Sequence, residues 1–213
     1  MKLNELRLWF IDLYNLVTDL NISISNAKFI LTNENPNESQ VIRNGFFQHH
    51  KYQLRFIIIV QLSKIFHDNE NQKRNLNKLF NRLKNEGYDT PFEELLASNK
   101  LSSNLITSKK QLLETINVHE ELIRKQAETI EALVEARDCL YAHTDPDCEV
   151  KLPSWQSMED LVALASKCFN DINYGLFGKQ VLFDKTDDWD VSPIVKHLSH
   201  YLDIRKENQK TDP

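Results

Sequence analysis

The chain has 213 residues, a formal net charge of −5, 41% hydrophobic residues and only 4 Gly. This length is sufficient for one domain with a substantial apolar core. Four Gly argue against a Gly-rich phosphate loop of the Walker or Rossmann type, and β-branched alternating runs are nearly absent. The abundance of Leu, Asn, Lys and Glu predicts a mostly helical protein.

Three amphipathic patterns in the first half of the chain predict helices. They cover residues 3–20, 40–66 and 72–84. A polar break around Pro36 separates the first two patterns, and we expect Phe46 and Phe47 of the second to face inward. Gly87 ends the third.

The second half opens with Thr90-Pro91-Phe92-Glu93, which has the composition of a helix start. A longer pattern then extends from residue 108 to about residue 142, or roughly 50 Å if the helix is unbroken. Further helices are predicted at residues 158–177, ended by Gly178, and from Ser192 to about Arg205. The sequence therefore predicts one all-α domain over residues 1–206, an antiparallel helical bundle with extra peripheral helices, and a flexible tail over residues 207–213.

Charge is distributed unevenly along the chain. Residues 40–84 contain nine Lys and Arg side chains but only two acids, Asp68 and Glu70. This stretch predicts a basic surface that meets phosphate groups, or an ordinary cationic helix face. The run His49-His50-Lys51 lies within it, although adjacent side chains on a helix do not face the same way.

The three cysteines, Cys139, Cys148 and Cys168, form no CxxC pair. No secretory signal opens the sequence, and its longest apolar run, residues 56–60, is too short to cross a bilayer. We therefore expect reduced cysteines, a cytoplasmic location and no membrane partner.

Arg137 occupies an unusual position in the long pattern of residues 108–142. The apolar residues recur at steps of three, four and seven, and Arg137 and Tyr141 continue their series. A buried guanidinium needs an anion or a wet cleft, because burying an unpaired charge is costly. The sequence therefore indicates either a functional site at Arg137 or a structural ion pair with a carboxylate from another helix.

His143 follows where the helical pattern stops, before the turn Thr144-Asp145-Pro146. The negative end of a helix dipole favours imidazolium by roughly 0.3–1 kcal/mol, so His143 is either a general acid and base or a plain helix cap. On an ideal helix Arg137 and His143 lie about 9 Å apart along the axis and about 120° apart around it. Either the helix end unwinds, or a second copy completes the site in a two-fold dimer.

The string Arg137-Asp138-Cys139-Leu140-Tyr141-Ala142-His143-Thr144-Asp145 resembles the signature of the HEPN superfamily (higher eukaryotes and prokaryotes nucleotide-binding). That signature is an Arg and a His separated by four to six residues at the end of a core helix, with a polar residue after the Arg. The Tyr-Ala-His-Thr-Asp ending is similar to the AbiU-like abortive-infection branch. The likeness covers about nine residues.

This resemblance implies a dimer of helical bundles that acts as a metal-independent endoribonuclease, in a toxin–antitoxin or antiphage system. It implies catalytic roles for Arg137 and His143, with Asp138 in support, and an antitoxin or defence protein as a partner. We further predict that Tyr141 and Asp145 contact the RNA substrate, although a core position suits Tyr141 better than a substrate contact. No cofactor and no metal is expected.

Two other functions fit the same residues. A non-catalytic HEPN module would bind nucleotide or RNA, or regulate a partner, and would depend on the basic stretch more than on His143. A helical scaffold would use Arg137 only as a structural ion pair. His197 and His200 are half of a metal site at most, since nothing local completes it.

Overall fold

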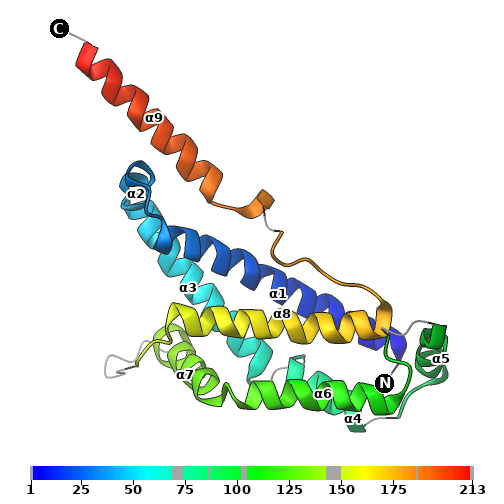
Figure 1. Ribbon diagram of the computed structural model, residues 1–213. Helices are drawn as coiled ribbons and strands as arrows, with labels where there is room; N and C mark the ends of the chain where they lie inside the picture. The colour runs from blue at the N-terminus through cyan, green and yellow to red at the C-terminus, as the bar shows by residue number, and fades with distance from the viewer. Residues whose placement is uncertain are drawn as a thin grey trace.

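The computed structural model describes residues 2–68, 74–85, 87–101, 105–142, 150–185 and 187–211. Within these ranges the chain is helical and contains no strand (Figure 1). The predicted all-α class and helical bundle are therefore confirmed.

The helices follow one another along the chain with short connections. They are α1 (Leu3–Thr32), α2 (Pro36–Ile42), α3 (Gly45–Phe66), α4 (Leu76–Asn85), α5 (Thr90–Ser98), α6 (Lys109–Arg124), α7 (Ala127–Arg137), α8 (Trp155–Phe177) and α9 (Ser192–Thr211). A π-helical turn, Asp138–Ala142, follows α7, and short 3₁₀ turns lie at Asn99–Leu101 and Asp187–Trp189.

The core lies where α1 packs against α3 and α8, and where α3 packs against α7. Helices α1 and α8 run side by side in opposite directions (Figure 1). Helix α6 lies along α8 and also contacts α4, so α4 and α6 cover one side of the core. Fully buried Leu and Ile side chains from α1, α3 and α8 supply most of the packing, at about 25 cal/mol for each Å² of apolar surface removed from water.

Helix α9 projects away from the α1–α8 pair and contacts the short helix α2 (Figure 1). Asn37 of α2 donates to Asp203 (2.8 Å), and Lys206 donates to Gln40 (2.8 Å). The helix continues to Thr211, beyond the predicted end near Arg205. The domain boundary at residue 206 and the flexibility of the tail remain predictions.

The pattern of residues 40–66 forms two helices instead of one. The break comes at Arg43-Asn44, because the Asn44 side chain accepts a hydrogen bond from the Phe46 amide (3.0 Å) and caps α3. Phe47 is buried, whereas Phe46 is 70% exposed. The inward orientation predicted for Phe46 is therefore wrong: adjacent helical side chains point about 100° apart, and Phe47 takes the core position.

The long pattern of residues 108–142 also divides, at Lys125-Gln126, where Gln126 leaves helical geometry (φ −102°, ψ 11°). Helix α6 buries the face expected of it, whereas α7 buries Leu133 and Ala136. The buried stripe predicted through Arg137 is therefore correct only in part: Ile130, Val134 and Arg137 are half-buried, and Arg137 lies at the edge of the buried face that Leu133 and Ala136 form.

The described cysteines differ in state. Cys168 is a free, buried thiol of α8, and burial raises its pKa to about 12. Cys139 is disulfide-bonded, so the prediction of reduced cysteines is wrong for this residue. None of the helices in the described ranges has the length and apolar character needed to cross a membrane.

Candidate functional site

Helix α7 packs closely against the core just before the motif of residues 137–145. Leu133 and Ala136 are fully buried against the core, and α7 packs along α3. The Ser63 hydroxyl of α3 lies 2.8 Å from the Ile59 carbonyl oxygen and 3.5 Å from that of Leu133. These contacts fix the backbone one helical turn ahead of Arg137.

Arg137 is the last residue of α7, and its side chain is 19% exposed. Its Nε and Nη2 atoms each lie 2.7 Å from the same carboxylate oxygen, Oδ1 of Asp138. Asp138 is the first residue of the π-helical turn, and half of its side chain is exposed. The guanidinium therefore sits at the edge of the core with its charge balanced by a carboxylate that remains in contact with water.

The π-helical turn determines how the chain leaves Arg137. Such turns are rare, occur mostly as single turns within α-helices, and are often found at functional sites. Ideal α-helical spacing therefore does not apply to Asp138–Ala142, because the backbone of these residues is π-helical.

The structure brings together two of the five predicted site residues, Arg137 and Asp138. The backbone of Tyr141 lies in the π-helical turn, and its side chain is not described. His143 and Asp145 lie outside the described residues. Their roles, and the pairing of His143 with Arg137, remain predictions.

The chain that returns from the motif is anchored to the middle of α3. Arg55 donates from Nη2 to the carbonyl oxygen of Pro153 (2.7 Å), and its guanidinium carbon lies 5.2 Å from the centre of the Trp155 ring. Ser154 then caps α8 by accepting from the Ser157 amide (3.0 Å). Helix α3 therefore contacts the segments on both sides of the motif, α7 before it and Pro153 to Trp155 after it.

The basic stretch of residues 40–84 divides into two parts. The cations of α4 and its N-terminal flank face carboxylates of other segments. These ion pairs are Arg74–Asp12, Lys78–Asp68 (3.9 Å), Arg82–Glu5 and Lys84–Glu120 (2.8 Å). Much of the positive charge predicted for this half of the stretch is therefore balanced within the bundle.

The cations near the start of α3 have a different environment. Arg43 is exposed, and the Lys51 ammonium donates to the neutral Gln48 amide oxygen (2.9 Å). In the part of the chain that the structure describes, neither side chain forms an ion pair. The sequence shows the excess of cations, but only the ion pairs that α4 forms with α1 and α6 show which of these cations are balanced.

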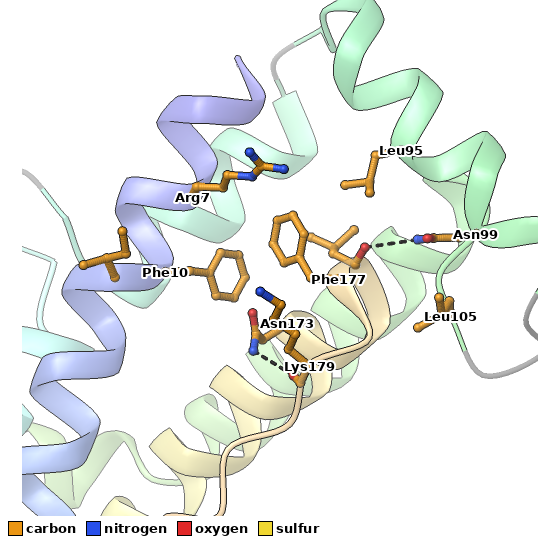
Figure 2. Close-up of a pocket in the computed structure, with 10 residues that line it drawn as sticks. Arg7, Phe10, Leu95, Asn99, Leu105, Asn173, Phe177 and Lys179 are labelled. Carbon is orange, nitrogen blue, oxygen red and sulfur yellow. Dashed lines mark hydrogen bonds between the residues drawn. The ribbon is translucent and has the colours of Figure 1, made fainter.

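Figure 2 shows a cavity of about 460 Å³ at the other end of α8, between α1, α5 and the last turn of α8. Phe10 and Phe177 give it an apolar wall, and their rings pack edge-on, with their centres 5.5 Å apart. The amides of Asn99 and Asn173 are engaged by backbone carbonyls, those of Leu176 (3.2 Å) and Lys179 (2.7 Å). The cavity lies at the C-terminal end of α8, whose 23 residues extend over about 35 Å, and its lining holds no carboxylate, His or Cys.

Among the described residues, no three His, Cys, Asp or Glu side chains are grouped as a metal site would require. Comparisons with protein-family models, curated proteins and solved structures find no match to this chain. The candidate site therefore rests on Arg137, Asp138, the π-helical turn and the sequence that follows it.

Proposed function

We propose that the protein is a metal-independent endoribonuclease of the HEPN type, with Arg137 and His143 as catalytic residues and Asp138 in support. The observation that carries the proposal is the position of Arg137. The Arg137 guanidinium lies at the edge of the core and is bound by its neighbour Asp138 at the start of a π-helical turn. The predicted catalytic residue His143 follows six positions later in the sequence. The resemblance of residues 137–145 to the HEPN signature supports the same assignment.

The geometry of the Arg137–Asp138 pair argues against a purely structural role. A structural ion pair ties separate elements together, as Lys84 and Glu120 tie α4 to α6. In the described part of the chain, the ion pair of Arg137 is with the adjacent residue. A pair with a half-exposed carboxylate contributes at most about 1 kcal/mol to stability, so the scaffold alternative gains little from it.

The proposed reaction is cleavage of RNA by its own 2′-hydroxyl. His143 takes the proton from that hydroxyl as its oxygen bonds to the adjacent phosphorus, and the bond between phosphorus and the 5′-oxygen breaks. The leaving 5′-oxygen gains a proton from an imidazolium, so the products carry a 2′,3′-cyclic phosphate and a 5′-hydroxyl. Arg137 clamps the phosphoryl oxygens and stabilises the developing charge. Tyr141 and Asp145 are proposed to contact the RNA.

A second copy of the chain would supply the second imidazole. One His serves as base and the other as acid when two motifs face each other across a two-fold axis. This arrangement makes the active unit a homodimer and removes any need for both roles to fall on one side chain. A nuclease of this kind acts on cytoplasmic RNA as a toxin or an antiphage effector. An antitoxin or a defence protein would inhibit its activity.

The test is RNA cleavage in excess EDTA by the wild type and by His143→Ala, with tRNA and mixed cellular RNA as substrates and with product ends mapped. We expect cleavage by the wild type alone, leaving 2′,3′-cyclic phosphate ends. Cleavage that persists in His143→Ala, or that needs a divalent metal, would contradict the proposal.

Matched control variants separate the motif from general effects of losing a charge. Arg124→Ala removes an exposed arginine at the end of α6 that pairs with Glu121, and His197→Ala removes an exposed histidine of α9. Both controls should cleave RNA like the wild type. If Arg124→Ala is as inactive as Arg137→Ala, the loss reflects charge alone, and the assignment of Arg137 fails.

A binding module without catalysis is the second candidate, and the cations near the start of α3 favour it. Arg43 and Lys51 form no ion pair in the described part of the chain, so they are available to phosphates. This function predicts RNA binding that survives His143→Ala and weakens steeply with salt, together with no cleavage by any variant.

A further inference from the structure

The first half of α3 exposes a row of rings on the surface of the bundle. We name it the ring face, and it consists of Phe46, His49, His50, Tyr52 and Phe56. Phe46 is 70% exposed and Tyr52 is 56% exposed, and Phe56 is exposed as well. An exposed cluster of large apolar side chains on one helix marks a binding surface more often than a chance arrangement does.

The rings are ordered with respect to one another. The rings of Phe46 and His50 lie 6.3 Å apart and are nearly parallel (16°), and those of His49 and Tyr52 are likewise 6.3 Å apart and nearly parallel (20°). Phe47, buried in the core, packs edge-on against Phe46 at 5.2 Å and limits its rotation. The adjacent histidines, which point different ways, therefore each belong to one ring pair.

The charge around the ring face is positive. Residues 40–66 include Arg43, Lys51, Arg55 and Lys64 and no acid. The nearby cations Arg43 and Lys51 form no ion pair in the described part of the chain, in contrast to those of α4. Two copies of such a surface repel each other, whereas a polyanion is attracted, so the charge favours nucleic acid over a second copy of the chain.

The ring face is also close to the motif in the fold. Helix α3 packs along α7, and its Arg55, in the middle of the helix, binds the Pro153 carbonyl oxygen beyond the motif. From Phe46 to Phe56 the face is about 15 Å long, or about four nucleotides at 3.4 Å per stacked base. A strand bound here lies on the helix that packs against α7, which carries Arg137 of the candidate site.

We propose that the ring face binds single-stranded RNA by stacking unpaired bases on its rings while Arg43 and Lys51 contact the phosphates. This inference rests on the proposed function for the choice of RNA as the polyanion. Aromatic platforms bind any base, because every base has a flat π surface. Paired bases in a duplex have no free face to stack, so single-stranded or looped RNA is the substrate class that this surface selects.

The test measures RNA binding by the full chain with His143→Ala in every variant, so that cleavage does not interfere. The probe is a fluorescein-labelled 12-nucleotide oligouridylate, followed by fluorescence anisotropy at several KCl concentrations, with a self-complementary RNA duplex of the same length beside it. Phe46→Ala should raise Kd about tenfold, and adding Tyr52→Ala should raise it further. Tyr201→Ala, which removes an equally exposed tyrosine from α9, is the matched control and should bind like the parent.

A charge variant keeps the test decisive if a ring variant folds poorly. Lys51→Glu removes a cation without removing a ring, and it should weaken binding and reduce the salt dependence. Equal affinity of the parent, Phe46→Ala and Lys51→Glu would overturn the inference, as would equal affinity for the duplex and the single strand. A ring variant that changes from dimer to monomer by light scattering, with RNA affinity unchanged, would show that the face joins two copies, and would also overturn it.

The two proposals fail in different ways. If the chain with His143 intact binds RNA through the ring face but cleaves none, the nuclease proposal fails and the ring face stands. If Phe46→Ala binds the oligouridylate like the parent while the chain with His143 intact cleaves RNA, the nuclease stands and the ring face fails.

Discussion

Helices α6 and α7 each carry a basic side chain within a series of apolar positions, and the two side chains differ in how deeply they are buried. His119 of α6 is 1% exposed and lies among the buried residues of that helix. Arg137 of α7 remains partly exposed beside Asp138, while Leu133 and Ala136 take the buried face. The break at Lys125-Gln126 separates the two helices and changes which side of α7 meets the core.

The difference follows from the chemistry of the two side chains. A histidine can enter the core by losing its proton, and burial lowers the pKa of His119, against an opposing effect of the nearby Asp171 carboxylate. An arginine keeps its charge at any working pH, so it requires an anion and access to water. Arg137 has both in its contact with Asp138, and this is the environment that a site for phosphate chemistry also requires.

The largest expected effect separates activity from stability at Arg137. If cleavage depends on the guanidinium, Arg137→Ala should lower kcat/KM for RNA by about 10³-fold, as expected when a positioned donor to the developing charge is lost. The free energy of unfolding should change by less than about 1 kcal/mol, because the ion pair with Asp138 joins adjacent residues and its carboxylate is half-exposed. Kinetics and calorimetry on the same preparation would check both. The opposite outcome, intact cleavage with a large loss of stability, would favour the scaffold function.

Leu133→Ala should show the reverse pattern on the same helix. The side chain is fully buried, so its truncation should lower the free energy of unfolding by about 2–5 kcal/mol through lost apolar burial and the cavity left behind. Chemical denaturation would measure the loss. Cleavage by the remaining folded fraction should match that of the wild type, since Leu133 lies one turn before the motif. Ile130→Ala, which removes a partly buried side chain of α7, provides a milder comparison.

The helices could be predicted from the sequence wherever one apolar stripe extends from cap to cap. Helix α8 is the example: Ser154 caps it, Gly178 ends it in a left-handed conformation (φ 65°), and its predicted face is buried. The break at Asn44 does have a sequence signal, since Asn44 is a preferred cap and Asn-Gly pairs mark turns, but the apolar periodicity continues across it. The break at Gln126 has no such signal. The outward position of Phe46 depends on which of two adjacent phenylalanines meets the core, and that choice is made by tertiary packing.

The sequence predicts where the candidate site lies in the chain, but not the backbone geometry or the surroundings of its residues. The Arg137–His143 spacing identified the end of α7, and Asp138 is indeed the carboxylate next to the guanidinium. The π-helical turn has no sequence signal of its own, since Asp138-Cys139-Leu140-Tyr141 also suits an α-helix. The ring face could not be predicted, because its members are interspersed with core residues of α3 and the exposure of Phe46 follows from the burial of Phe47.

A smaller effect is expected at Asp138. Asp138→Asn keeps the shape of the side chain and removes its charge, so Arg137 is oriented less firmly, and RNA cleavage should fall about 10–100-fold if Asp138 supports Arg137 as a positioning residue. Stability should change by less than about 1 kcal/mol. Asp138→Glu should recover part of the activity by restoring the charge. Asn and Glu variants that cleave RNA like the wild type would leave Asp138 without a part in the reaction.

The smallest expected effect is a dependence of stability on pH that comes from α6. The pKa of His119 is lowered mainly by burial, with its Nε2 atom 3.3 Å from the Asp171 carboxylate and Lys167 close by, and its ring against Phe80. The unfolded chain therefore binds a proton near pH 6.5 that the folded chain resists, so the stability is fully present above that pH and is lost as the pH falls below it.

His119→Leu removes this titration while keeping an apolar side chain in the core, so its unfolding free energy should decline less than that of the wild type between pH 7.5 and pH 5.5. Urea unfolding at several pH values measures the two slopes. The exposed His197 serves as the matched control, because His197→Leu should leave the wild-type slope unchanged. Parallel slopes for the wild type and His119→Leu would mean that the buried imidazole becomes protonated in place, stabilised by Asp171. In that case α6 would resemble α7 after all, with a charged base held at the core by one carboxylate.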